Sequence, residues 1–254
     1  MESDGEQIYY EVTGQGSPVV LCHGLGGNHA IWWRQIEAFA GRYRVVVWDQ
    51  RGFGNSTLRT GEVGPRSARR DLRALFDHLA LERATVVGQS LGGYVALGFT
   101  IDNPDLVDTL VLSTTLAGAE PEHVANLINA EPDRNRSNRR EHPVLSREFC
   151  AAQPDLGVLY NQISSFGARP SPIAVLSAMA SDMLPIEAIG GVRARTLVMM
   201  AVDDEHCPPH AMQPVADAIP DGCLVEIAGG HSAYYERPAE WNKVVLDFLA
   251  AGCG

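Results

Sequence analysis

The sequence predicts an α/β fold in which a mostly parallel central sheet is flanked by helices and interrupted by one inserted helical cap. Strand-like and helix-like segments alternate over most of the 254 residues. Most of the strand-like runs are continuously apolar, which is typical of strands buried on both faces of a parallel sheet. The alternation stops between about residues 116 and 191, where no buried strand is legible.

The first predicted strand, residues 6–12, alternates polar and apolar side chains as an edge strand does. The continuously apolar strands that follow are Val19–Cys22, Val45–Trp48, Thr85–Val87, Leu110–Leu112 and Leu197–Met200, and a last strand-like run is Leu224–Ile227. The carboxyl ends of parallel strands share one edge of the sheet, where ligands bind in open α/β folds. Residues that directly follow these strands are therefore the candidates for a site.

Helices are predicted between the strands. Ser67 can cap one helix and Pro238 opens another, and each carries an apolar stripe that is expected to dock on the sheet. The stripes are Leu72, Leu75, Phe76 and Leu79, and Trp241, Val244, Val245, Phe248 and Leu249. We expect residues 1–115 and 192–254 to form the α/β core. Prolines cut residues 116–191 into short helical pieces, which are expected to form the cap.

The charge of the chain limits its partners. A net charge of −11 argues against binding to nucleic acid or to an anionic membrane, because both require clustered Lys and Arg. The basic stretch 134–147 is interrupted by acidic residues and is interpreted as a solvated surface, although it could face an anionic substrate. No apolar run is long enough to predict a membrane span. The sequence leaves open whether the chain forms a homodimer.

The expected location is the cytoplasm. Residues 1–6 are acidic where a secretory signal would be basic and then apolar. The five cysteines are odd in number and form no C-x-x-C pair, which favours free thiols over a disulfide framework or a zinc site. Cys22 and Cys223 are interpreted as small apolar side chains in the core.

A candidate nucleophile lies in the segment Gly88–Gly92, which reads G-Q-S-L-G between the β-rich run 84–87 and a small-residue segment that reads as a helix. The corner would be so tight that a side chain at Gly88 or Gly92 would collide with the neighbouring strand or helix. It would hold the Ser90 hydroxyl clear of the sheet edge. A G-x-S-x-G pattern alone is a weak signal, because chance supplies it in roughly one chain in seven of this length.

A serine nucleophile needs a base to accept its proton and an acid to orient that base. His231 is the candidate base, because it follows the strand-like run 224–227 through two glycines and precedes the final helix. The candidate acids are Asp203, Asp204 and Glu205, which follow the strand at 197–200. The end of the strand at 110–112 is the other plausible location for the acid, but no carboxylate directly follows it. One of the three acids is therefore expected to orient His231.

Acyl transfer also requires hydrogen-bond donors for the developing oxyanion. The backbone N–H of Leu91, directly after the nucleophile, is one candidate. The second is expected from the glycine-rich loop 23–27, with the N–H of Leu25 as first choice and that of Gly26 as second.

Two alternative interpretations fail, one on the spacing of its glycines and the other on the prolines between its histidines. The loop 23–27 could belong to a dinucleotide-binding fingerprint, but the third glycine would fall at position 29, which is a histidine. His206 and His210 have the i, i+4 spacing of a zinc motif, but Pro208 and Pro209 between them spoil the helix that this motif needs. We therefore expect no cofactor and no catalytic metal.

The ordered elements resemble the α/β-hydrolase superfamily. They are the His23-Gly24 loop, the segment Asp49–Ser56, the corner Gly88–Gly92, Asp204 before Pro208, and Gly230-His231. The order Ser, Asp, His is that of the family. In the family pattern the acid lies four residues before a proline, which selects Asp204 ahead of Asp203. Asp49 and Arg51 fall in a structural turn of the family and are expected to brace the core.

The resemblance implies a cofactor-free serine hydrolase, similar to bacterial esterases, enol-lactonases and carbon–carbon hydrolases. Hydrolysis of a small carboxylic ester or lactone by water, through an acyl-enzyme, is the leading hypothesis. The alternatives are a carbon–carbon bond hydrolase of the ring-cleavage-product type, a perhydrolase or haloperoxidase-like enzyme with the same triad, and a non-catalytic receptor for a small ligand.

Substrate specificity is expected to depend on the cap and on residues near the oxyanion loop. The candidates near the loop are Gly26 and Trp33, with Trp32 as an alternative. The candidates in the cap are Phe149, Met179 and Met183, with Leu159, Tyr160 and Phe166 as further apolar residues that could face Ser90. Each could equally pack in a core, because apolar residues at helical spacing usually do.

Overall fold

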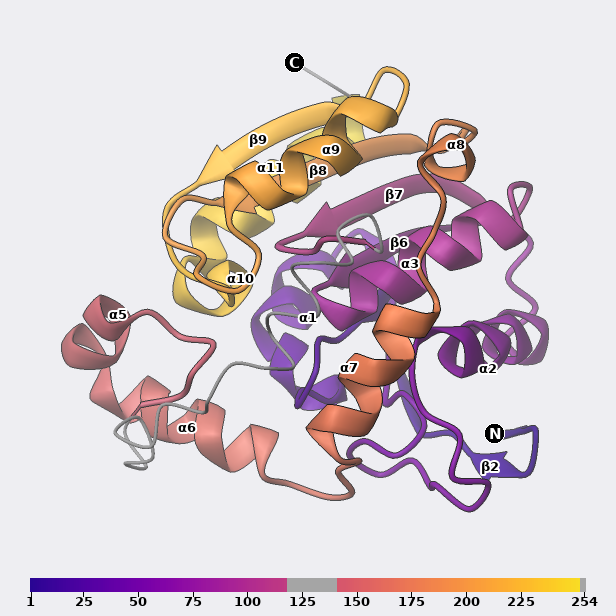
Figure 1. The fold of residues 1–254 in the computed structure, drawn as a ribbon, viewed down its shortest axis with the longest axis horizontal. Helices are drawn as coiled ribbons and strands as arrows, with labels where there is room; N and C mark the ends of the chain where they lie inside the picture. Colours follow the sequence, from indigo (N-terminus) through magenta and orange to yellow (C-terminus); the bar gives the residue numbers. More distant parts are fainter. Residues whose placement is uncertain (118–140, 252–254) are drawn as a thin grey trace.

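A seven-stranded sheet forms the centre of the computed structural model, which describes residues 1–117 and 141–251 (Figure 1). The strand order is β3-β5-β4-β6-β7-β8-β9; β3 pairs antiparallel with β5, and every other pair is parallel. The strands are β3 (Tyr10–Thr13), β4 (Ser17–Cys22), β5 (Tyr43–Trp48), β6 (Ala84–Gln89), β7 (Val107–Ser113), β8 (Arg195–Ala201) and β9 (Cys223–Ile227). The prediction of a mostly parallel sheet is confirmed.

The predicted first strand is divided in two. β1 (Glu2–Ser3) and β2 (Glu6–Gln7) form a small antiparallel hairpin, and only β3 joins the main sheet, as its edge. Between β2 and β3 the backbone leaves the ladder, because the N–H of Ile8 donates to Met1 and the N–H of Tyr9 donates to the Ser56 hydroxyl. These partners were not predictable from an alternating pattern.

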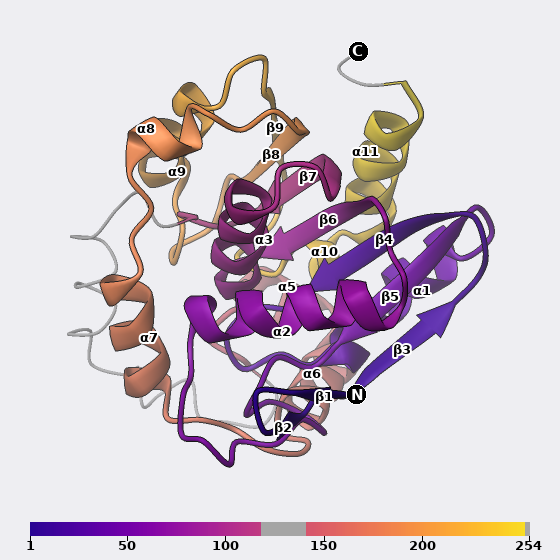
Figure 2. The same cartoon turned by 90° about the vertical axis from the view of Figure 1, so that its right-hand side faces the viewer.

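Each face of the sheet has its own hydrophobic core, which explains the continuously apolar strands. Val20, Val46 and Val86 pack on one face with α2 (Pro65–His78) and α3 (Leu91–Asp102). The neighbouring strand residues point to the other face and pack with α1 (Trp33–Phe39) and α11 (Pro238–Ala251). Figure 2 shows α2 and α3 on one side of the sheet and α11 on the other.

The remaining elements of the core are the 3-10 helix η1 (His29–Trp32), α9 (Pro209–Ala218) and α10 (Ala233–Glu236). The final helix begins at Pro238 as predicted. The predicted cap of α2 is wrong: the helix begins at Pro65, and Ser67 lies within its first turn, where its hydroxyl donates to Gly64. The fixed φ of a proline suits the first helical position, so Pro65 takes that place.

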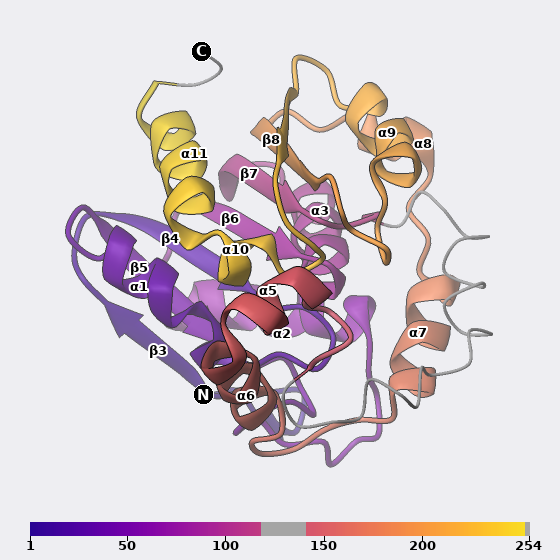
Figure 3. The same ribbon diagram turned by 90° about the vertical axis from the view of Figure 1, so that its left-hand side faces the viewer.

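Short helices occupy the described part of the predicted cap: α5 (Arg147–Ala152), α6 (Pro154–Ser164), α7 (Pro172–Ser181) and α8 (Ile186–Ile189). Prolines begin α6 and α7 and precede α8, in keeping with their expected role as breaks. Figure 3 shows α5 and α6 beside α10, with α7 apart from them. Residues 118–140, which include residues 134–140 of the basic stretch 134–147, lie outside the described residues, and the domain boundaries stay a prediction.

One of the described cysteines departs from the expectation of free thiols. Cys22, Cys150 and Cys207 are free and buried. Cys223 is disulfide-bonded and only half-buried, so the prediction of a free, core-packed thiol is wrong at this position. Cys253 lies outside the described residues. Among the helices that the structure describes, none combines the length and apolar character of a membrane span.

Candidate active site

Ser90 lies at the sharp corner between β6 and α3, with φ 52° and ψ −119°. This left-handed backbone is costly for a residue with a side chain and marks a strained position. A Cβ atom at Gly88 would lie 2.3 Å from the Gly92 carbonyl oxygen, and one at Gly92 would lie 2.0 Å from the Cys22 carbonyl oxygen. Only glycine fits at these two positions, so the corner can close and present the Ser90 hydroxyl.

Ser90, His231 and Asp204 meet at the carboxyl edge of the sheet, where β6, β9 and β8 end. His231 Nε2 lies 2.9 Å from Ser90 Oγ, and His231 Nδ1 lies 2.9 and 3.1 Å from the two carboxylate oxygens of Asp204. A carboxylate only accepts hydrogen bonds, so Nδ1 carries the imidazole proton and Nε2 faces the serine hydroxyl as an acceptor. The arrangement can remove the proton from Ser90.

The structure brings Asp204 to His231, and leaves Asp203 and Glu205 exposed. Asp204 is only 3% exposed, and its Oδ1 also accepts the N–H groups of His206 and Cys207 at 2.8 and 2.9 Å. Burial acts to raise the pKa of Asp204, but the electrostatic interaction with His231 and the hydrogen bonds to the carboxylate outweigh it and lower the pKa. Asp204 is therefore held in its anionic form.

Two buried side chains hold the backbone of the His231 loop in place, and the sequence analysis missed both. Gln89 Nε2 donates to the His231 carbonyl at 3.0 Å, and Thr114 Oγ1 donates to the same oxygen at 2.9 Å. Gln89 Nε2 also donates to Thr114 Oγ1. Gln89 occupies the x position before the serine in the G-x-S-x-G pattern. Its place next to the candidate nucleophile was the only feature of the sequence that could have pointed to it.

The glycine-rich loop lies against the corner. A Cβ atom at Gly24 would be 3.1 Å from Ser90 Cβ, and the loop is closed by a hydrogen bond from Gly27 N–H to Gly24. The N–H groups of Leu25 and Leu91 donate no hydrogen bond to any residue that the structure describes. Both predicted oxyanion donors thus belong to segments next to Ser90; their role stays a prediction.

His23 is buried behind this loop as a neutral imidazole. Its Nε2 accepts the N–H of Gln50, so Nδ1 carries the proton and donates to the Gly24 carbonyl. Burial lowers the pKa of His23, which favours this neutral form. His23 therefore positions the glycine loop.

Asp49 and Arg51 are buried in structural hydrogen bonds. Asp49 accepts the N–H groups of His29 and Asn55 at 2.6 and 2.8 Å and also binds the His29 ring. Arg51 binds Asp71 with two hydrogen bonds of 2.7 and 2.6 Å. These contacts fit the expectation that both residues brace the core.

The predicted substrate-facing residues are found in different surroundings. Met179 on α7 packs in the core on the α2–α3 face, and Trp32 packs against Tyr234 in the opposite core. Trp33 is 41% exposed beneath the Arg34 guanidinium, and the Phe149 ring contacts Tyr235. Met183, which follows α7, is half-buried.

Among the described residues, no atom other than those of Gly26 and its two chain neighbours would lie within 4 Å of a Cβ atom at Gly26, so the glycine-rich loop 23–27 has open space at this point. This residue and those of the cap remain predictions as substrate contacts.

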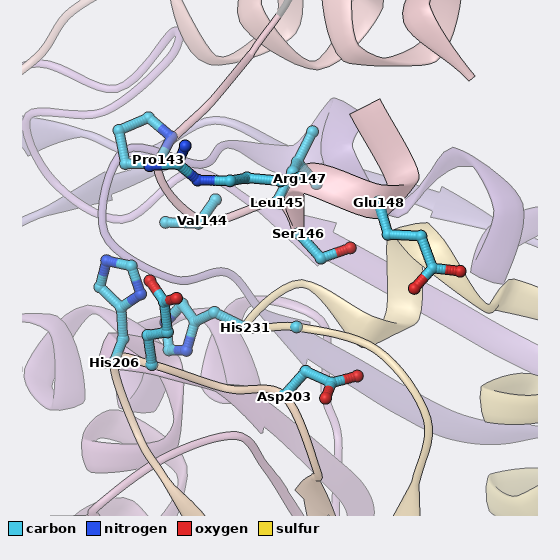
Figure 4. A pocket seen from close by; sticks show the side chains of 11 residues that line it. Pro143, Val144, Leu145, Ser146, Arg147, Glu148, Asp203, His206 and His231 are labelled. Carbon is cyan, nitrogen blue, oxygen red and sulfur yellow. The ribbon is translucent and has the colours of Figure 1, made fainter. Parts of the chain in front are cut away.

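A pocket of about 230 Å³ lies beside His231 (Figure 4). Residues 143–148 of the cap line one side of it, and Asp203, His206 and His231 line the other. The pocket therefore reaches the imidazole that is hydrogen-bonded to Ser90.

Comparison with known proteins places this geometry in a family. A family model described as the alpha/beta hydrolase fold matches residues 17–148. A candidate carbamate hydrolase, RutD, from Variovorax paradoxus is 33% identical, with 96% of each chain covered. A 2-hydroxy-6-oxononadienedioate/2-hydroxy-6-oxononatrienedioate hydrolase from Comamonas testosteroni is 28% identical, with 97% of this chain and 92% of the relative covered. A solved esterase from Thermogutta terrifontis is 26% identical with a TM-score of 0.83, over 97% of this chain and 94% of the esterase.

Proposed function

The chain belongs to the α/β-hydrolase family, and from that premise we propose that it is a serine hydrolase that cleaves a small carboxylic ester or lactone through an acyl-enzyme. The continuous hydrogen-bond chain from Ser90 through His231 to Asp204 carries this proposal. A serine hydroxyl is a poor nucleophile at neutral pH until such a base accepts its proton.

The reaction begins when Ser90 Oγ attacks the substrate carbonyl and His231 Nε2 takes the hydroxyl proton. Asp204 stabilises the imidazolium that forms and keeps the ring in its orientation. His231 then donates the proton to the leaving oxygen. Water, deprotonated by the same imidazole, attacks the acyl-enzyme and releases the acid together with free Ser90.

The N–H groups of Leu25 and Leu91 are the proposed donors to the oxyanion. Loss of one such donor costs about 3 kcal/mol of transition-state stabilisation. The backbone of Leu91 is fixed by the start of α3, and the Leu25 loop is fixed by the buried His23, so neither donor has to reorganise during the reaction.

The similarity to an esterase over nearly the whole chain favours an ester electrophile. A second candidate is hydrolysis of a carbon–carbon bond, favoured by the similarity to the Comamonas enzyme. The substrate in that enzyme's name has no ester group, so its hydrolysis breaks a bond between carbons. Both reactions need the same nucleophile, base and oxyanion donors, and differ in the leaving group.

The test is hydrolysis of p-nitrophenyl acetate by the wild type and by Ser90→Ala, together with labelling by a fluorophosphonate. We expect turnover and labelling in the wild type, and loss of both in the variant. Absence of turnover and of labelling in the wild type would contradict the proposal and favour a non-catalytic receptor.

A panel of substrates separates the electrophiles. Short esters, lactones, carbamates and ring-cleavage products are compared by kcat/KM, and peracid formation is measured in the presence of hydrogen peroxide. Higher kcat/KM for the ring-cleavage products than for every ester and lactone would replace the leading proposal by the second candidate.

A further inference from the structure

A second imidazole lies beside the candidate base. His206, in the turn between β8 and α9, has its ring centroid 4.9 Å from that of His231, with the ring planes tilted by 31°. One possible ligand atom from each of Asp204, His206 and His231 lies within 4.8 Å of the other two. The proposed reaction uses the side chains of Asp204 and His231, but it has no use for the His206 imidazole.

We propose that these three side chains form an inhibitory site for a divalent transition-metal ion such as Zn²⁺. Imidazole nitrogens and a carboxylate oxygen are ligands that Zn²⁺ takes in proteins at about 2.0–2.2 Å. A tetrahedral ion holds such atoms about 3.4 Å apart, so the group must close by up to about 1.4 Å. His206 is half-buried in the turn before α9, and rotation of its side chain toward the other two ligands would supply this movement.

The pocket beside His231 gives a metal ion access to the site. His206 and His231 both line it. Among the residues that the structure describes, the lining also carries the carboxylates of Glu148, Asp203 and Glu205 and one guanidinium, that of Arg147 (Figure 4). A cleft with excess negative charge raises the local concentration of cations, and the whole chain carries a net charge of −11. The surroundings therefore favour a cation over an anion.

Metal binding at this site would stop the proposed reaction through either nitrogen of His231. Coordination through Nε2 occupies the lone pair that accepts the Ser90 proton. Coordination through Nδ1 moves the proton that is donated to Asp204 onto Nε2, which can then no longer accept the Ser90 proton. The inhibition rests on the proposed function, whereas the binding does not. Mg²⁺ and Ca²⁺ prefer oxygen ligands and should not compete.

The experiment measures Zn²⁺ binding by isothermal titration calorimetry to the wild type, His206→Gln and His210→Gln. His210 is exposed in the first turn of α9 and lies outside the three-residue group, so it is the matched control. Loss of a group that merely hydrogen-bonds a metal ligand costs about 10–100-fold in affinity. The loss of His206 should therefore raise the Kd by at least about tenfold, with no change for His210→Gln.

Hydrolysis of p-nitrophenyl acetate is measured in parallel, as the ratio of rates with and without Zn²⁺. We expect inhibition of the wild type and of His210→Gln with an inhibition constant that matches the Kd, reversal by EDTA, and no effect of Mg²⁺. His206→Gln should need at least about tenfold more Zn²⁺ for the same inhibition.

Equal Zn²⁺ affinity of His206→Gln and the wild type would overturn the proposal, provided that circular dichroism shows both to be folded. Binding without inhibition of an active enzyme would also overturn it. If the wild type hydrolyses no ester, the proposed function fails, and calorimetry alone still decides the metal site.

Discussion

At the scale of single residues, the candidate chemistry depends on which of three consecutive carboxylates points inward after β8. The Asp204 side chain is buried against His231, and its Oδ1 accepts two backbone N–H groups of the following turn. Asp203 and Glu205, its neighbours in the sequence, are exposed and line the pocket beside His231. A buried carboxylate with this many donors stays ionised, which is the form that can stabilise an imidazolium.

Asp204→Asn should lower kcat for p-nitrophenyl acetate by about 10³–10⁴-fold, because an amide in this place favours the wrong imidazole tautomer. Asp203→Asn is the matched control and should change kcat by less than about twofold, as expected of an exposed side chain. Steady-state kinetics of both variants decide the assignment. Equal losses in the two variants would contradict Asp204 as the acid.

Thr114 is a positioning residue in this scheme, because its hydroxyl holds the His231 carbonyl and does not touch the reacting atoms. Thr114→Val keeps the shape of the side chain but removes both hydrogen bonds of the hydroxyl, the one to the His231 carbonyl and the one from Gln89. The bond to the carbonyl is worth about 1 kcal/mol. We expect kcat to fall by about 5–10-fold with KM nearly unchanged.

Thr109→Val is the control for this variant, since Thr109 is a buried residue of β7, the strand that Thr114 follows, and its hydroxyl has Arg195 as its partner. Both variants should lose similar stability, but only Thr114→Val should lose kcat. Parallel losses of kcat in the two variants would refute a positioning role for Thr114.

The main site residues were predictable because each follows a strand, whereas their supports were not. Ser90, Asp204 and His231 lie one, three and four residues after the ends of β6, β8 and β9, and parallel strands end at one edge. The partner of Gln89 lies 142 residues away in the chain. No local sequence pattern distinguishes a glutamine with such a distant partner from any other buried glutamine.

At the scale of secondary-structure elements, the strands that lie between the two hydrophobic cores were the easiest to predict. The residues of β4 alternate between the two cores, so the run is apolar throughout. The division between β2 and β3 could not be predicted, because it depends on the contact of Tyr9 with Ser56, which is 47 residues away. The start of α2 was predicted wrongly because serine is a common N-cap residue, which favoured Ser67. In the structure Pro65 takes the first position of the helix.

The hairpin of β1 and β2 is fixed to the loop 57–60 through one carboxylate. Glu6 accepts hydrogen bonds from Thr57 and from the N–H groups of Arg59 and Thr60. Burial acts to raise the pKa of Glu6, but these hydrogen bonds prevail and lower it from 4.5 to about 2. A carboxyl group whose pKa is lower in the folded than in the unfolded state stabilises the fold fully at pH values above its unfolded-state pKa. This stabilisation is lost as the pH falls toward the folded-state pKa.

Glu6→Gln should therefore destabilise the protein at pH values above 4.5, and the difference from the wild type should shrink as the pH falls from 4.5 toward about 2. Urea unfolding midpoints across this range measure it. Glu2→Gln, in the exposed partner strand β1, should cause no such pH-dependent difference. A deficit of Glu6→Gln that stays constant down to the lowest pH would contradict the assignment.

At the scale of the whole molecule, the described cap helices are attached to the core on two sides of the candidate site. On one side, Tyr235 Oη donates to Leu156 of α6, and Ser146 N–H donates to Glu236 of α10. On the other side, Asp182, which follows α7, accepts from Arg69 of α2 at 2.8 Å. The two attachments use different helices of the core. Within the segment that includes α7, Met179 is buried, whereas Met183 is half-buried.

This difference predicts opposite effects of two methionines at the same end of α7. Met179 is 5% exposed in the core on the α2–α3 face, so Met179→Ala should cost about 2–5 kcal/mol of unfolding free energy and leave the ratio of kcat/KM between short and long esters nearly unchanged. Met183 is half-buried after the helix ends, and Met183→Ala should cost less than about 1 kcal/mol.

If the cap faces the substrate at Met183, the same variant should change that kcat/KM ratio by about tenfold, which is the scale of a few methylene contacts. Thermal unfolding and ester chain-length profiles of the two variants provide the comparison. A stability loss for Met183→Ala as large as that of Met179→Ala, with an unchanged profile, would place Met183 in the core and remove it from the substrate site.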